Sequence, residues 1–376
     1  MSPAQMPDGL AEFSVVFTDR ALNHMSQQFQ GVMRDLSTRL KKVYGAQATA
    51  LVPGGGTYAM EAVARQLTTA DGPPALVIRN GWFSFRWSQI LEAIGSPTPV
   101  VLAASPSVDA ITAPFYPPPI ETVVDAIETH RPPVVFAPHV ETSAGMLLPN
   151  AYLRAVAEAV HAYGGLFVLD CIASGTVWVD MAELGVDFLI SAPQKGWSGP
   201  ACAGVVMMGP RGLAAVQSQN SSSFAMDLGR WLGIMRAYED GGHAYHATMP
   251  TDAIAGFHEA VLATEAFGLE AACAAQLELG RRVRTLLAEY GFSSVAAPGF
   301  EAPGVVVVYA PNEAIRSGRA FAAQGIQVAG GVPLRCGERS DFATVRLGLF
   351  GLDKLADIDG TVARLRAALD GIQTAS

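Results

Sequence analysis

A carboxylate and a lysine each follow a buried strand in the middle of this 376-residue chain. Asp170 ends the apolar run Leu166–Asp170, and Lys195 follows the next run, Phe188–Ser191, after the short loop 192–194. Ligands of an open α/β sheet bind beyond the carboxyl ends of its strands, so both side chains are expected at a ligand site. A lysine desolvated there loses its proton more readily and can attack a carbonyl carbon. A surface lysine and a helix-capping aspartate are the alternative interpretation.

A glycine-rich turn, Gly54-Gly55-Gly56-Thr57, precedes a predicted helix over 58–67. Free backbone N–H groups at a helix start, together with the helix dipole, suit a phosphate group. The G-x-G-x-x-G spacing of dinucleotide-binding turns and the Gly-Lys pair of P-loops are both missing. The turn therefore indicates either a phosphate site of another kind or a turn without a ligand.

Two further segments follow predicted strands. His139-Val-Glu-Thr-Ser-Ala-Gly145 comes after Val134–Pro138, and the aromatic-rich segment Asn80-Gly-Trp-Phe-Ser-Phe-Arg86 comes after 75–79. Each segment alone is compatible with an ordinary loop or with core packing. Together, a lysine, a carboxylate, a phosphate-binding turn and an aromatic ring are the groups that pyridoxal 5′-phosphate needs, because its chemistry requires a Schiff-base lysine and an acidic partner for the ring nitrogen.

These segments resemble the class V aminotransferases of pyridoxal-phosphate fold type I, close to the alanine/serine–glyoxylate aminotransferase group. The resemblance extends from about Gly54 to Gly351, and it depends on the order and spacing of several short motifs. The motifs are Gly55-Gly-Thr57 with Ala59-Met-Glu61, Asn80-Gly81 with Phe83 and Arg86, His139-x-Glu141-Thr-Ser-x-Gly145, Asp170 with Ala173-Ser174, Gln194-Lys195 with Pro200, Tyr245-His-x-Thr248-x-Pro250, and Arg346-x-Gly348.

The resemblance implies a role for each matched residue around pyridoxal 5′-phosphate. Lys195 would form the Schiff base and then move the substrate proton, and Asp170 would keep the ring nitrogen protonated. Phe83 would stack on the ring, and Thr142 would reach the phenolic oxygen. The phosphate would be bound by Gly55, Gly56, Thr57 and Gln194, and by Tyr245 and Thr248 of a neighbouring subunit. A homodimer with sites at the subunit interface is therefore expected.

The resemblance also implies how the substrate binds. Arg346 would hold the α-carboxylate through two parallel hydrogen bonds. The family's amino-terminal Gly-Pro motif is missing here, and residues 18–24 stand in its place. Within them, Asn23 and His24 are candidates for a polar pocket around the distal side chain of the substrate. The alternative interpretation is a helix cap for Asn23 and an interface histidine for His24. Trp197, unusual after the Gln-Lys pair, is expected to place a bulky indole near the site.

The implied enzyme is an aminotransferase that moves an amino group from a small L-amino acid, of the alanine or serine type, to a 2-oxo acid such as glyoxylate or pyruvate by a ping-pong mechanism. The alternative is a lyase or desulfurase on the same scaffold, with Cys336 as nucleophile ten positions before Arg346. Neighbouring Arg335 and Arg339 would lower the pKa of that thiol, but the His-Cys pair typical of such loops is absent. A non-enzymatic role is disfavoured by the intact set of catalytic residues.

A layered α/β fold must position these residues. Near-continuous apolar runs alternate with amphipathic stretches, which predicts a mostly parallel sheet covered by helices on both faces. The expected strands are 75–79, 99–103, Val134–Pro138, Leu166–Asp170, Phe188–Ser191 and 204–208. After about residue 250 the pattern changes to a smaller α+β unit with one or two helices over 252–290, strands Val305–Tyr309 and 344–349, and helices 313–324 and 352–372. The predicted domains are an N-terminal segment 1–20, a large cofactor-binding domain 21–255 and a small C-terminal domain 256–376.

The composition narrows the class of protein. Half of the residues are hydrophobic, 16% are charged and the net charge is −9, which excludes a disordered chain and argues against a nucleic-acid partner. No run reaches the roughly 18 apolar residues of a membrane span, and the first ten residues lack the pattern of a signal peptide. The four cysteines form no C-x-x-C pair, so no metal site is expected. These features predict a cytoplasmic protein without a membrane partner.

Overall fold

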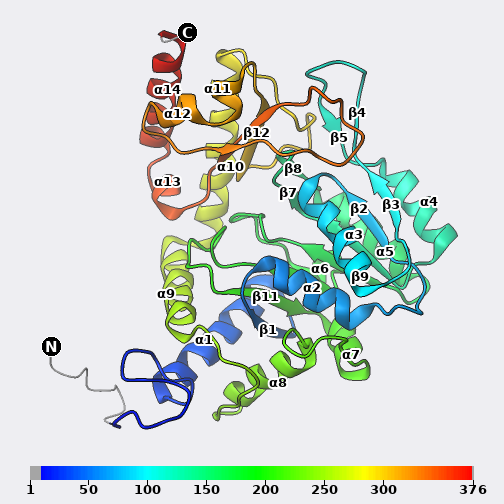
Figure 1. Cartoon of the computed structure of the whole chain (residues 1–376), viewed down its shortest axis with the longest axis vertical. Coiled ribbons are helices and arrows are strands. Elements are labelled where there is room, and N and C mark those ends of the chain that lie inside the picture. Colours follow the sequence, from blue (N-terminus) through cyan, green and yellow to red (C-terminus); the bar gives the residue numbers. More distant parts are fainter. Residues whose placement is uncertain (1–9, 375–376) are drawn as a thin grey trace.

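The structure of the chain, a computed structural model, describes residues 10–374, so the first nine residues of the predicted N-terminal segment lie outside the described residues. A seven-stranded sheet lies in the lower part of Figure 1, and a three-stranded sheet lies above it. The order of the large sheet is β1 (Ala48–Pro53), β11 (Ala203–Met208), β10 (Phe188–Ser191), β9 (Leu166–Asp170), β6 (Val134–Pro138), β2 (Leu76–Arg79) and β3 (Val100–Ala103). The order of the small sheet is β12 (Val305–Tyr309), β14 (Thr344–Gly348) and β13 (Ala329–Gly330).

Helices cover both sheets, and two short hairpins extend from the loops. The helices around the large sheet are α1 (Gln27–Tyr44), α2 (Gly56–Leu67), α3 (Trp82–Ile94), α4 (Ile120–His130), α5 (Asn150–His161), α6 (Met181–Leu184), α7 (Pro210–Ser218) and α8 (Leu228–Glu239). The remaining helices are α9 (Thr251–Phe267), α10 (Leu269–Glu289), α11 (Glu313–Arg316), α12 (Arg319–Ala322), α13 (Leu352–Ala356) and α14 (Ile358–Thr374). The hairpins are β4 (Ser105–Pro106) with β5 (Phe115–Tyr116), and β7 (Val140–Glu141) with β8 (Met146–Leu147).

The large sheet is mostly parallel, as its apolar runs predict. β3, β2, β6, β9 and β10 run in one direction, and β11 is antiparallel to both of its neighbours, β10 and β1. The segment between β10 and β11, residues 192–202, contains no helix, and it is too short for the crossover that a parallel pair requires. The reversal of β11 and the edge strand β1 were not expected, because an apolar run does not encode the direction of its strand.

The strand direction brings several carboxyl ends to one edge of the sheet. β2, β6, β9 and β10 are parallel neighbours, and β1 runs in the same direction because it is antiparallel to β11. In the register, Pro138 pairs with Asp170 at the ends of β6 and β9. The segments that leave these strands therefore start side by side.

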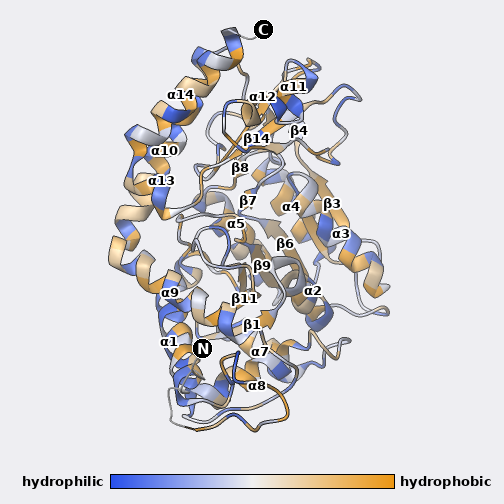
Figure 2. Cartoon of the chain, turned by 60° about the vertical axis from the view of Figure 1, so that its left-hand side comes forward, coloured by the Kyte–Doolittle hydropathy of each residue, from blue (hydrophilic) through white to orange (hydrophobic). Residues whose placement is uncertain are grey.

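The core lies between the large sheet and its helices. β6, β10 and β11 are buried along their whole length. The buried face of α5 consists of Leu153, Val156, Ala157 and Val160, whose spacing of three and four positions forms one apolar stripe. Figure 2 shows the same arrangement, with hydrophobic strands inside and helices that are hydrophobic on one side only.

The long helical stretch after residue 250 is divided into two helices. Gly268, with a φ of 97°, separates α9 from α10, and the two helices are bent by 83°. α9 contacts α1 beside the large sheet, and α10 contacts β12 and α14 beside the small one. The predicted domain boundary after residue 255 falls inside α9. The helices expected over 313–324 and 352–372 are each interrupted once, at 317–318 and at Asp357.

Between residues 10 and 374, no single helix combines the length and the apolar composition needed to cross a membrane; α9 and α10 meet that test only as a bent pair.

Candidate active site

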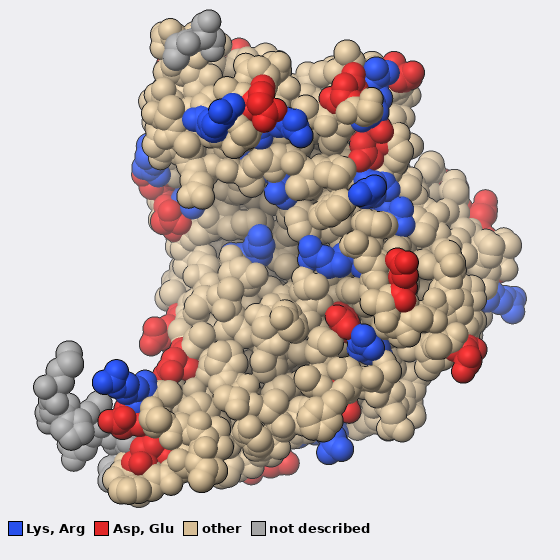
Figure 3. Space-filling view, in the orientation of Figure 1, with Lys and Arg blue, Asp and Glu red and all other residues tan. Residues whose placement is uncertain are grey.

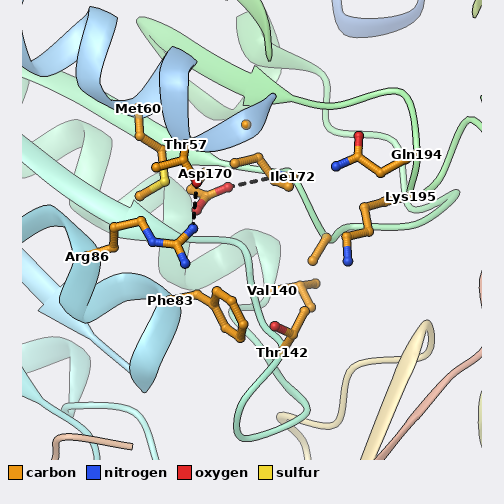
Figure 4. Close-up of a pocket in the computed structure, with 12 residues that line it drawn as sticks. Thr57, Met60, Phe83, Arg86, Val140, Thr142, Asp170, Ile172, Gln194 and Lys195 are labelled. Atoms are coloured by element: carbon orange, nitrogen blue, oxygen red, sulfur yellow. Dashed lines mark hydrogen bonds between the residues drawn. The ribbon is translucent and has the colours of Figure 1, made fainter. Parts of the chain in front are cut away.

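The strand ends open onto a cavity of about 190 Å³. In Figure 4, Lys195 lies on the right side of the cavity, and Phe83, Arg86 and Asp170 lie on its left side. The lining residues are Gly56, Thr57, Met60, Phe83, Arg86, Val140, Thr142, Asp170, Ile172, Ala173, Gln194 and Lys195. Seven of the residues predicted from the sequence are in this set, and they come from the end of β9 and from the segments that follow β1, β2, β6 and β10.

Lys195 is half-buried on the loop that follows β10. Burial, and then the positive charge of Arg346, lower the pKa of the lysine ammonium group. Its Nζ lies 5.7 Å from the centre of the Phe350 ring, and within residues 10–374 it has no hydrogen bond or ion pair. A desolvated amine without a partner is suited to react with a carbonyl carbon.

Asp170 is buried at the end of β9. Within the described chain its carboxyl group accepts one hydrogen bond, at Oδ1, from the backbone N–H of Ile172 at 2.9 Å. Burial raises the pKa of this carboxyl group to about 7; the Ile172 N–H and the Arg86 charge lower it, and Glu141 raises it further. A nearby cation would therefore stabilise the ionised form strongly.

The start of α2 forms a cradle for an anion beside Asp170. Gly55 is the N-cap and supplies no capping side chain, so the first N–H groups of the helix remain available. A Cβ atom on Gly56 would lie 2.4 Å from Cδ1 of Ile172, so a side chain at this position would collide with the cavity wall. Thr57 accepts a hydrogen bond from Nη1 of Arg86 at 2.7 Å, which adds a positive charge at the same end.

Two guanidinium groups lie against the Phe83 ring. The Cζ atoms of Arg86 and Arg346 are 5.2 and 5.7 Å from its centre. Arg346 is half-buried on β14 and donates from Nε to the carbonyl of Gly330, which leaves its terminal nitrogens available. Figure 3 shows Lys and Arg side chains gathered around the middle of the molecule, between the parts that hold the two sheets. This distribution favours an anionic substrate.

Glu141 is fully buried next to the cavity, and its carboxyl group accepts five hydrogen bonds. The backbone N–H groups of Phe83, Ser84 and Ser143 donate at 3.2, 2.9 and 3.0 Å, and the hydroxyls of Ser84 and Ser143 donate at 2.7 Å each. Two of these N–H groups belong to the first turn of α3. Glu141 thus holds the start of α3, and with it Phe83, in place.

Four predicted residues form a separate cluster within the chain. Asn23, His24, Tyr245 and Thr248 do not line the cavity, and the rings of His24 and Tyr245 are 5.6 Å apart. The Tyr245 hydroxyl is hydrogen-bonded to that of Thr248 at 3.1 Å, and Tyr245 is 55% exposed. Asn23 accepts from the N–H of Met25 and donates to Glu12. The phosphate contacts of Tyr245 and Thr248 from a neighbouring subunit, and the contribution of Asn23 and His24 to a distal pocket, stay predictions.

The structure also places two neighbouring residues. The indole of Trp197, two positions after Lys195, is buried against Tyr44 and Trp178 and does not line the cavity. The Cys336 thiol contacts the carbonyls of Arg79 and Leu334, and burial raises its pKa to about 12. A nucleophilic cysteine needs the opposite shift.

Arg86 is a charged cavity residue to which the sequence analysis assigned no role. It contacts Phe83 and Thr57, and it lowers the pKa of Asp170. Its position, three residues after Phe83 on a helix, was the signal available in the sequence. Within residues 10–374, no group of three or more His, Cys, Asp or Glu side chains is arranged to hold a metal ion.

Comparisons with known proteins agree on one family. The family model described as aminotransferase class-V matches residues 11–359. The 2-aminoethylphosphonate–pyruvate transaminase 2 of Paraburkholderia xenovorans is 30% identical over 94% of this chain and 90% of its own length. Among solved structures, an alanine–glyoxylate aminotransferase from Nostoc superposes with a TM-score of 0.79 at 24% identity, covering 94% of this chain and 89% of that one. An aspartate aminotransferase from Thermus thermophilus superposes with 0.75 at 25% identity, covering 93% of each.

Replacing Glu141 by Gln should destabilise the protein by at least about 2 kcal/mol, because an amide NH₂ group would face N–H and O–H donors. The measurement is urea unfolding. Glu128→Gln on the exposed face of α4 is the matched control and should change the free energy of unfolding by less than about 0.5 kcal/mol. Equal stability of the two variants would contradict the importance of this buried carboxyl group.

Replacing Asp170 by Asn should change how stability depends on pH in the protein without a bound small molecule. A carboxyl group whose folded pKa is raised stabilises the fold below its unfolded pKa, and this stabilisation is lost as the pH rises through about 7. The stability of the unsubstituted protein relative to Asp170→Asn should therefore fall between pH 4 and 8, by at most about 1.4 kcal/mol per pH unit. Chemical unfolding at a series of pH values measures this difference, and parallel curves would refute the shift.

Proposed function

The chain belongs to the class-V aminotransferase family, and we propose that it uses pyridoxal 5′-phosphate to move an amino group from a small amino donor to pyruvate or glyoxylate. It is an aminotransferase, and its fold is fold type I of the pyridoxal-phosphate enzymes. The observation that carries the choice of cofactor is one cavity that contains an unpaired lysine, a buried carboxyl group and a helix start without a capping side chain.

The residues of the cavity fit this cofactor at three points. The N–H groups of Gly55, Gly56 and Thr57 would bind the phosphate, and no side chain at position 56 obstructs the approach. Asp170, whose pKa burial raises to about 7, would gain a positive partner from a protonated ring nitrogen. Lys195 is the amine at the same cavity. The remaining wall of the cavity is formed by Gln194, Phe83 and Thr142. In this proposal Gln194 contacts the phosphate, Phe83 stacks on the ring and Thr142 contacts the phenolic oxygen.

The chain's own residues would divide the reaction among them. When bound, the cofactor supplies an electron sink that stabilises negative charge at the substrate α-carbon. Lys195 Nζ would take the proton from that carbon and return one, since burial and Arg346 lower its pKa toward the working range of a base. Arg346 would hold the substrate carboxylate through its free terminal nitrogens, while its Nε stays on Gly330.

The proposed substrates are small molecules that carry a carboxylate or another anionic group. An α-carboxylate on alanine, serine, pyruvate or glyoxylate would pair with Arg346, which has no acidic partner among residues 10–374. The relative from Paraburkholderia makes 2-aminoethylphosphonate a further candidate donor. The same proposal includes a homodimer that places Tyr245 and Thr248 at the partner's phosphate. It also includes a contribution of Asn23 and His24 to the distal pocket, and a cytoplasmic location.

A desulfurase reaction is the second candidate, and the environment of Cys336 argues against it. Its Sγ lies 3.5 Å from the Arg79 carbonyl, and burial holds the thiol in its protonated form. The positive charge of Arg79 opposes this shift, but it is a smaller effect than burial. A transaminase should be indifferent to Cys336→Ala, whereas a desulfurase should lose its activity.

Replacing Lys195 by Ala should reduce amino transfer at least about 10³-fold, because both the carbonyl-reactive amine and the proton carrier are lost. The measurement is the absorption spectrum of the purified protein with a panel of amino donors and no acceptor, followed by turnover with pyruvate and glyoxylate. A spectrum that a donor converts to the amine form of the cofactor identifies that donor. Release of sulfide or ammonia with an unchanged spectrum would favour a lyase, and no cofactor absorption after reconstitution would refute the proposal.

Replacing Arg346 by Lys should raise KM for the 2-oxo acid by about 10- to 100-fold, since a lysine cannot make two parallel hydrogen bonds to a carboxylate. Initial rates at varied acceptor concentration measure the effect. Arg364→Lys on the exposed face of α14 is the matched control and should leave KM within twofold. A normal KM in the Arg346 variant would remove this residue from the substrate site.

A further inference from the structure

We propose that Tyr44 and Trp197 clasp the two ends of the loop that carries Lys195, so that Trp197 is a positioning residue for the lysine; the consequence for catalysis rests on the proposed function. The Lys195 loop is defined here as residues 192–199. Within the described chain the Lys195 side chain has no hydrogen bond, and the position of its amine depends on the backbone of this loop.

One hydroxyl group joins the two ends of the loop. Trp197 Nε1 donates to the Tyr44 hydroxyl at 3.1 Å, and the Tyr44 hydroxyl donates to Oγ of Ser191 at 3.4 Å. Ser191 is the last residue of β10, and Tyr44 is the last residue of α1. The helix thus contacts the chain both before and after Gln194-Lys195.

The backbone around Trp197 is closely packed and strained. A Cβ atom on Gly196 would lie 2.0 Å from the carbonyl oxygen of Gly175, so the backbone is in direct contact with its neighbour there. Ser198 has a φ of 56°, a conformation that costs energy in any residue with a side chain. Two backbone bonds, from Ser198 N to the Lys195 carbonyl and from Gly199 N to the Pro193 carbonyl, close the turn. The packed indole provides the contact that keeps this strained turn in place.

The indole lies in a box of aromatic rings. Its ring centre is 4.7 Å from that of Trp178, 6.2 Å from that of Tyr44 and 6.3 Å from that of Phe257. Trp197 is 1% exposed and Tyr44 is 4% exposed, so water does not replace a hydrogen bond lost between them. Trp178 belongs to the same box, but its Nε1 donates to the carbonyl of Leu269 on α10 and not to the Lys195 loop.

This difference between the two tryptophans provides a matched control. Trp197→Phe and Tyr44→Phe each remove the clasp while keeping a ring, and Trp178→Phe removes a ring hydrogen bond from the same box. Hydrogen exchange of residues 192–199 in the purified protein should accelerate at least about tenfold in the first two variants and remain within twofold in Trp178→Phe. The double variant Tyr44→Phe/Trp197→Phe should be no worse than either single one, because both break the same contact.

In the loaded enzyme the clasp variants should lower kcat by about 10- to 100-fold, since a small displacement of a reacting group has effects of this size. KM for the 2-oxo acid should stay within twofold, because Arg346 is on another sheet. The pH at which the bound cofactor changes its absorption should shift in Trp197→Phe and Tyr44→Phe but not in Trp178→Phe. If Tyr44 and Trp197 only stabilised the fold, their replacement would change the melting temperature and leave this pH unchanged.

The two hypotheses fail in different ways. Unchanged exchange of residues 192–199 in both clasp variants overturns the clasp, whether or not a cofactor is bound. Faster exchange with an unchanged kcat and pH midpoint overturns the positioning role. A wild-type protein without cofactor absorption overturns the proposed function, and with it the consequence for catalysis, while the exchange experiment still decides whether the loop is clasped.

Discussion

The geometry of the site depends on one fully buried carboxyl group, that of Glu141. It accepts five hydrogen bonds, three from Phe83 and Ser84 in the first turn of α3 and two from Ser143. These bonds join the segment that follows β2 to the segment that follows β6. Its charge also acts at a distance, because it raises the pKa of Asp170, Arg346 and Cys336. One residue thereby positions Phe83, helps to keep Arg346 charged and helps to keep the Cys336 thiol protonated.

The parallel part of the sheet explains why chemically different groups meet in one cavity. Strands that run in the same direction end at the same edge of the sheet, so the loops that follow them start there. A carboxyl group, a lysine, an aromatic ring and a helix start lie together at this edge. Arg346 reaches the same place from the small sheet and approaches the Phe83 ring from there. In the proposed function, Arg346 on a separate sheet would let the substrate contact move independently of the cofactor contacts.

Residues away from the cavity determine how precisely its groups are held. Asp170 is fixed by the strand it ends, and Phe83 by the hydrogen bonds of Glu141. Lys195 has neither kind of support, since it lies on a loop, and the proposed clasp of Tyr44 and Trp197 supplies it from α1. In each case a buried polar contact restricts the group to few conformations, whereas an exposed side chain would adopt many.

Local patterns in the sequence determined the strands and the residues that follow them. Val134–Pro138, Leu166–Asp170 and Phe188–Ser191 have the predicted bounds, because uninterrupted apolar runs that end in polar or turn residues are a property of neighbouring positions. The same runs predicted that Asp170 and Lys195 lie at one edge of the sheet, whereas the family was recognised from the order and spacing of short motifs. The tertiary structure alone decided the reversal of β11, the contact of Glu141 with Ser84 57 positions away, the inward direction of Trp197 and the protonated state of Cys336. These features depend on which distant groups are buried together, and burial with a distant partner is not encoded in the spacing of neighbouring residues.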